Sequence, residues 1–86
     1  MRTYGSDTYF GTQAAALIYA ERETRDRGYN IQYADYLWTE HVNYGSSVKY
    51  QFPLYNYKRN CRSRKWVHIN LYRMDSGNYE LTYYIN

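Results

Sequence analysis

The stretch WVHINLYRMDSGNYELTYYI, from Trp66 to Ile85, decides the fold of this chain. It holds two runs of alternating apolar and polar side chains, separated by turn-forming residues, which is typical of a β-hairpin. A three-residue loop over Asp75–Gly77 pairs the apolar residues with one another: Leu71 with Leu81, Ile69 with Tyr83 and Val67 with Ile85. A two-residue loop would instead pair Leu71 with Thr82 and mix the two faces. We therefore predict the three-residue loop, because a slip of one residue flips every side chain and Gly77 suits the positive φ at its last position.

The same register predicts the second face of this hairpin. This face carries polar and aromatic side chains: Trp66, His68, Asn70, Tyr72, Thr82 and Tyr84.

A strand rich in aromatic residues precedes the hairpin. Alternation puts Val48, Tyr50, Phe52 and Leu54 on one face and Lys49, Gln51, Tyr55 and Tyr57 on the other. Pro53 lacks a backbone N–H, so it indicates an edge strand or a bulge. A turn is expected at Gly45-Ser46-Ser47, and an earlier strand from about Asn30 to Val42.

One helix is expected over residues 12–27. Thr12 can cap its N-terminus, alanines and a leucine follow, and Gly28 suits the left-handed position that ends a helix. The apolar first half is expected to be buried and the second half, rich in charged side chains, to be solvated. Leu17, Ile18, Phe52, Ile69, Leu71 and Leu81 are predicted to form the core.

The fold class that follows is α+β. One N-terminal helix should pack on an antiparallel sheet of about four strands in a meander, with residues 1–86 as a single small domain. The chain has 14 tyrosines and 2 tryptophans, and each buried aromatic side chain removes about 150–250 Å² from water. One helix covers only one face of such a sheet, so the aromatic side chains of the second face become candidates for an interaction site.

Composition excludes several classes of protein. The longest apolar run, Ala14–Ala20, is far shorter than the roughly 20 residues needed to cross a bilayer. The N-terminus lacks the apolar stretch of a signal peptide, and the single cysteine, Cys61, allows neither an internal disulfide nor a cysteine-based zinc site. We therefore expect a cytoplasmic protein without a cofactor, a metal or a membrane partner.

The positive charge is concentrated in the second half of the chain. The net charge is +3, and five basic residues without an acid among them fall between positions 58 and 65: Lys58, Arg59, Arg62, Arg64 and Lys65. We expect them to form a basic loop that contacts phosphates or an acidic surface, although a solvated hairpin loop explains the same composition.

No pattern in the sequence predicts catalysis. The two histidines, His41 and His68, have no spacing typical of metal ligands, and there is no glycine-rich phosphate loop or nucleophile elbow. We predict a non-enzymatic protein without catalytic residues. A small basic ribonuclease of the toxin type remains a lesser alternative, with His68 as its candidate acid–base residue.

The predicted function is therefore binding. The predicted site combines the basic loop with an aromatic sheet face of Tyr55, Tyr57, Trp66, His68, Tyr72 and Tyr84. A protein partner is favoured over nucleic acid, because interfaces between proteins are enriched in tyrosine, tryptophan and arginine and arginine outnumbers lysine by 8 to 3 here. An accessory or inhibitor protein of the kind that phages and mobile elements encode fits this composition. A single-stranded RNA- or DNA-binding domain, in which tyrosines stack on bases, is the main alternative, and the uncovered face also allows a homodimer.

Overall fold

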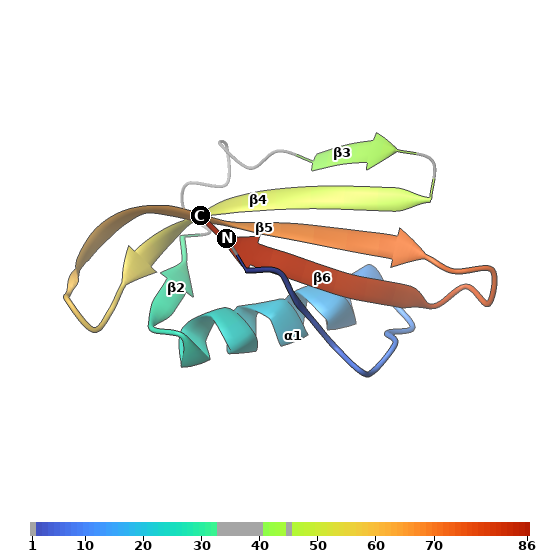
Figure 1. The fold of residues 1–86 in the computed structure, drawn as a ribbon, viewed down its shortest axis with the longest axis horizontal. Helices are drawn as coiled ribbons and strands as arrows, with labels where there is room; N and C mark the ends of the chain where they lie inside the picture. The colour runs from blue at the N-terminus through green and yellow to red at the C-terminus, as the bar shows by residue number, and fades with distance from the viewer. Residues whose placement is uncertain (1, 33–40, 45) are drawn as a thin grey trace.

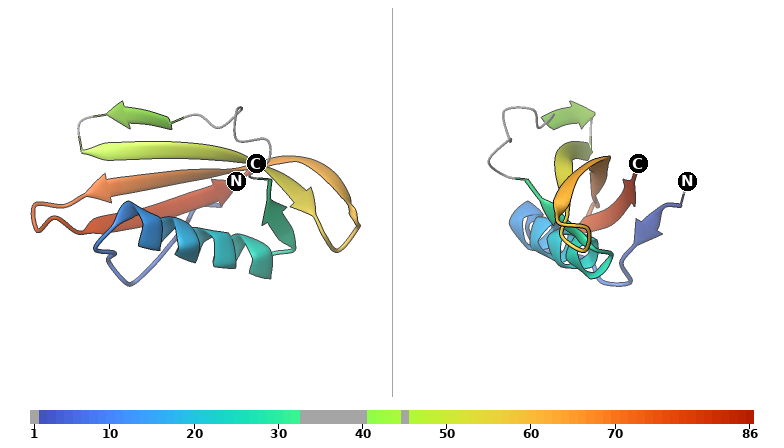
Figure 2. Two further views of the ribbon diagram at one scale, coloured as in Figure 1. Left: turned by 180° about the vertical axis from the view of Figure 1, so that it is seen from behind. Right: turned by 90° about the vertical axis from the view of Figure 1, so that its left-hand side faces the viewer.

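The protein is an α+β fold in which one helix packs on an antiparallel sheet, as seen in a computed structural model that describes residues 2–32, 41–44 and 46–86 (Figure 1). The elements in chain order are β1 (Tyr4–Gly5), α1 (Gln13–Asp26), β2 (Tyr29–Ile31), β3 (His41–Tyr44), β4 (Ser47–Asn56), β5 (Cys61–Arg73) and β6 (Tyr79–Ile85). The helix lies along one face of the sheet. The turn end of the β4–β5 hairpin curls and extends past the C-terminal end of α1 (Figure 2). The predicted fold class is confirmed.

The sheet has six strands in the described part of the chain, compared with the predicted four or so. Its order is β1-β6-β5-β4-β2, and β3 also pairs with β4. The meander β4-β5-β6 was predictable, whereas β1 has only two residues and shows no alternation. One strand was predicted from Asn30 to Val42. The structure has the separate strands β2 and β3 near the two ends of that range, and residues 33–40 lie outside the described residues. Gly45 of the predicted turn also lies outside them, and Ser47 belongs to β4.

The register predicted for the β5–β6 hairpin is confirmed. Leu71 pairs with Leu81, Ile69 with Tyr83 and Val67 with Ile85. The Met74 N–H donates to the Asn78 carbonyl at 2.8 Å and closes a loop of three residues, with Gly77 at a φ of 88°. The left-handed conformation at Gly77 is the one that a three-residue hairpin requires at its last position.

Helix α1 begins and ends where the sequence predicts, but its buried face is different. The Thr12 hydroxyl accepts from the Ala15 N–H at 3.1 Å, and Gly28 has a φ of 101° after the last turn. The buried residues recur every four positions along the whole helix: Ala16, Ala20 and Thr24. The expectation of a buried first half and a solvated second half is therefore wrong. Ile18, predicted for the core, is 58% exposed.

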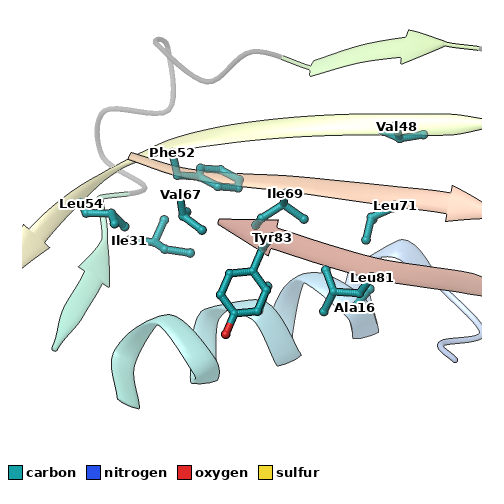
Figure 3. Close-up of a cluster of buried hydrophobic side chains, with 11 residues drawn as sticks. Ala16, Ile31, Val48, Phe52, Leu54, Val67, Ile69, Leu71, Leu81 and Tyr83 are labelled. Atoms are coloured by element: carbon teal, nitrogen blue, oxygen red, sulfur yellow. The ribbon is translucent and has the colours of Figure 1, made fainter. Parts of the chain in front are cut away.

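The hydrophobic core lies between α1 and the facing side of the sheet (Figure 3). Of the residues predicted for it, Phe52, Ile69, Leu71 and Leu81 are buried, while Leu17 is partly buried at its margin. Because the helix presents small side chains, it approaches the sheet closely, and the large apolar groups come from the strands. Tyr83, only 1% exposed, reaches from β6 toward the helix with its hydroxyl (Figure 3).

Candidate functional site

The candidate site lies on the face of the sheet opposite α1, which we call the outer face. Alternation along the strands and their register place these side chains on it: Lys49, Gln51 and Tyr55 on β4; Arg62, Trp66, His68, Asn70 and Tyr72 on β5; and Glu80, Thr82 and Tyr84 on β6. Their neighbours in sequence on β5, Val67, Ile69 and Leu71, are buried against the helix side. The hairpin face predicted from the sequence is therefore confirmed as a continuous surface across three strands.

A hollow in the middle of the outer face lies beside a pair of stacked rings. His68 and Tyr84 are cross-strand partners, and their ring centroids lie 4.5 Å apart with an interplanar angle of 16°. The hollow has a volume of about 430 Å³, and its polar lining includes Lys49, Gln51 and Asn70. Burial lowers the pKa of His68, so its imidazole is neutral near pH 7. The hollow can therefore offer a neutral aromatic wall together with hydrogen-bonding groups.

Three further predicted aromatic residues lie on the outer face. Trp66 is half-buried and pairs with Pro53, while Tyr72 is 47% exposed and pairs with both Ser47 and Glu80. Tyr55 pairs with Arg62, and its hydroxyl donates to the Asn60 side chain at 2.5 Å. These rings are spread along the strands, so they form a row of contacts and not a single cluster.

Tyr57 does not belong to this face, which corrects the prediction from alternation. Strand β4 ends at Asn56, and the Tyr57 hydroxyl donates to the Arg25 carbonyl of α1 at 2.6 Å. Alternation stops where the strand stops, so the turn carries this ring toward the end of the helix. With 40% of its surface exposed, Tyr57 adds a side-chain donor to a carbonyl at the end of the helix that also accepts from the Gly28 N–H.

The predicted basic loop does not exist as one loop. Strand β5 begins at Cys61, so Arg62 is a strand residue on the outer face, and only Lys58 and Arg59 lie in the turn between β4 and β5. The strand register shifts between Pro53 and Tyr55, leaving residues 63–65 opposite Leu54 alone. Arg64 is exposed in this bulge. Lys65 lies on the helix side with Arg27.

Side-chain and backbone hydrogen bonds hold the bulge. The Ser63 hydroxyl donates to the Leu54 carbonyl at 2.9 Å and accepts from the Lys65 N–H at 3.0 Å. The bulge prediction made from Pro53 is confirmed, whereas its edge-strand alternative is wrong, because β4 has partners on both sides. The bulge divides the five cations among different surfaces.

The sequence prediction missed two features of the outer face. Lys49 and Gln51 were placed on the correct face but not in the site, although the register puts them beside Asn70 and His68 in the hollow. Thr3 also lines the hollow from just before β1. Lys49 and Gln51 could have been assigned to the site by pairing the predicted β4 with β5. Thr3 could not, because a two-residue strand such as β1 shows no alternation in the sequence.

The described residues show no other arrangement typical of a catalytic or metal site. No group of three or more histidine, cysteine or acidic side chains could hold a metal ion within residues 2–32, 41–44 and 46–86. Cys61 is exposed at the start of β5 as a free thiol. Among the helices that can be described, none is both long and apolar enough to span a membrane. His41 lies in β3, at the position paired with Tyr50.

No protein-family model, curated protein or solved structure matches this chain.

Proposed function

We propose that this chain is a small non-catalytic binding protein of the accessory or inhibitor type, which docks its outer face onto a protein partner. The observation that supports it is the row of Arg62, Trp66, His68 and Tyr72 along one side of β5, flanked by Tyr55 and Tyr84. Val67, Ile69 and Leu71, which alternate with Trp66, His68 and Tyr72 along β5, are the residues of this strand that fill the core, so the row on the outer face is not needed for the core. Tryptophan, tyrosine and arginine are also the residues in which interface hot spots are enriched.

The distribution of the cations favours a protein over a single-stranded nucleic acid. Of the five residues of the predicted basic loop, the strand register puts only Arg62 beside the aromatic row. A strand of RNA stacked on this face would then meet Lys49 and Arg62 as its main phosphate contacts. Neutralising two phosphates supplies little counterion release, whereas two cations at the rim of a protein interface steer an acidic partner.

The partner expected from this chemistry is a protein with a matching concave or flat surface that carries acidic groups opposite Lys49 and Arg62. Glu80 is the one acid that the register places on the described outer face. The rings at Trp66, Tyr72 and Tyr84 would supply most of the buried area, because aromatic side chains give a large contact area at low conformational cost.

The experiment is capture of binding proteins from a nuclease-treated lysate, followed by measurement of affinity with the purified partner. Tyr72→Thr and Tyr84→Thr should each weaken binding by about tenfold or more, the loss typical of a hot-spot residue. Tyr9→Thr is the matched control, because Tyr9 is 53% exposed but lies in the segment between β1 and α1. Arg62→Glu should chiefly slow association.

Other outcomes of the same experiment would overturn this proposal. Salt-sensitive binding to oligonucleotides, with capture that disappears on nuclease treatment, would indicate the single-stranded nucleic-acid domain. Cleavage of RNA that is abolished by His68→Ala would indicate the ribonuclease. Self-association that Tyr72→Thr abolishes, with no other protein captured, would make the outer face a homodimer interface.

A further inference from the structure

We infer that a second hollow, on the helix side of the sheet, is a binding site for a small phosphorylated molecule. The hollow has a volume of about 420 Å³ and lies where β1, β2, β5 and β6 meet the C-terminal end of α1. Its charged and aromatic lining consists of Arg2, Tyr4, Asp26, Arg27, Tyr29 and Lys65. The volume falls within the range of about 300–1,000 Å³ typical of small-molecule sites.

Arg27 is held in position by two tyrosines. Its guanidinium carbon lies 3.5 Å from the centroid of the Tyr4 ring, and its Nε–H donates to the Tyr83 hydroxyl at 3.1 Å. Tyr4 and Tyr83 are cross-strand partners whose rings stack at 5.3 Å. Because the ring and the hydroxyl fix the orientation of the guanidinium, less conformational entropy is lost when it binds a ligand.

The terminal amino groups of Arg27 are left for a ligand. A guanidinium carries five N–H donors, and only the Nε–H of Arg27 has a partner among the described residues. The two remaining nitrogens form the planar fork that binds phosphate through two parallel hydrogen bonds. Tyr4 and Tyr83 fix the orientation of these nitrogens, and no acidic side chain among the described residues forms a hydrogen bond with them. This arrangement is expected of a preformed anion site.

The hollow is positively charged overall. Arg2, Arg27 and Lys65 bring three positive charges against the single carboxylate of Asp26. The guanidinium of Arg2 lies 5.2 Å from the same Tyr4 ring that Arg27 covers. Like charges gathered around one ring repel each other, and a bound dianion relieves that repulsion.

Two acceptors near the hollow have hydrogen-bond donors of their own, while the Glu23 carboxylate keeps its negative charge beside Arg27. The Glu23 carboxylate accepts from the Tyr83 hydroxyl at 3.4 Å. The helix end is also capped, since the Arg25 carbonyl accepts from the Tyr57 hydroxyl and from the Gly28 N–H. These bonds reduce the negative potential that the end of a helix otherwise presents.

This site is separate from the outer face. Lys65 and Arg62 are close in sequence, but the bulge puts Lys65 in this hollow and Arg62 on the opposite face beside Tyr55. A ligand here would therefore leave the proposed protein-binding surface accessible. The inference stands whether or not the outer face binds a protein.

The test is an NMR titration of the ¹⁵N-labelled protein with inorganic phosphate and, separately, with adenosine monophosphate, against sodium chloride at matched ionic strength. The amide signals of Tyr4, Arg27, Tyr29 and Lys65 should shift with both phosphate probes, while those of His68 and Asn70 should not. Tighter binding of the nucleotide would mean that the rest of the hollow also contacts the ligand. Equal affinities would mean that the phosphate group alone is recognised.

Lys65→Gln is the informative variant, because Lys65 is exposed and is not among the residues of the hydrophobic core. It should weaken phosphate binding by about tenfold, the loss expected for one charge-assisted hydrogen bond. Arg27→Gln should weaken it further, and its folding can be checked by thermal unfolding. Arg25→Gln is the matched control, since Arg25 lies in the same helix turn but not in the hollow.

Two results would overturn the inference. One is the absence of shifts around the hollow at millimolar phosphate and nucleotide. The other is equal binding by the Lys65→Gln and Arg25→Gln variants, because this would show only attraction to the overall positive charge.

Discussion

The two sides of strand β5 differ sharply in composition and in burial. Val67, Ile69 and Leu71 face α1 and are almost completely buried, whereas Tyr72, the residue after Leu71, is 47% exposed on the outer face. The first set is apolar, and the second set has an arginine, a tryptophan, a histidine, an asparagine and a tyrosine. One strand thus supplies both the stability of the fold and the surface that we propose for binding. Because the two sets alternate along β5, substitutions at neighbouring positions can test the two roles separately.

The largest expected effect comes from opening the core. Leu71→Ala removes a side chain with no exposed surface that pairs with Leu81. It should lower the free energy of unfolding by about 2–5 kcal/mol, from lost burial and the cavity left behind. Chemical denaturation monitored by circular dichroism measures this. A loss below about 1 kcal/mol would mean that this side of β5 does not supply the stability.

A smaller effect is expected where the core reaches the helix through a polar group. Tyr83→Phe keeps the ring but removes the hydroxyl that contacts Arg27 and Glu23. Burial raises the pKa of this hydroxyl, and the neighbouring Arg27 only partly offsets it, so it stays protonated and can donate to Glu23. Its removal should cost about 1–2 kcal/mol in unfolding free energy. An unchanged stability would show that the Tyr83 hydroxyl bonds contribute nothing to the fold.

A smaller effect still is expected from His68 on the outer face. Burial lowers its pKa in the folded protein, so the unfolded chain takes up its proton first as the pH falls. The contribution to stability is therefore full above about pH 6.5, the unperturbed value, and is lost below it. His68→Asn should make the pH dependence of unfolding shallower between about pH 7.5 and about pH 5. Identical pH profiles for the variant and the wild-type protein would contradict the buried, neutral imidazole.

The regular half of the sheet could be predicted because its residues leave one consistent register. Only a three-residue loop brings Leu71 opposite Leu81, and the Thr12 cap and Gly28 likewise give the helix ends. The burial of the helix was mispredicted, because its buried face consists of small residues and a threonine. The sequence shows clearly that the first half of the helix is apolar and the second half charged. It does not show clearly that Ala16, Ala20 and Thr24 form one buried line along the helix.

The β4–β5 end could not be predicted for a different reason. The first five residues of β5, from Cys61 to Lys65, include no large apolar side chain, so the alternation that marks a strand is missing. Backbone pairing and the bonds of Ser63 hold them in place instead. The anion site went unnoticed because its residues come from the N-terminus, the end of α1, β2 and β5. Only the folded chain brings them together.

The measurement that tests the central claim most directly compares Tyr72→Thr with Leu71→Ala in both unfolding and partner capture. Threonine keeps the preference for a strand, so Tyr72→Thr should change the unfolding free energy by less than about 1 kcal/mol while abolishing capture of the nuclease-resistant protein partner. Leu71→Ala should lose most of its stability. If Tyr72→Thr is as destabilising as Leu71→Ala, or captures the partner as well as the wild-type protein does, the two sides of β5 do not have the separate roles described here.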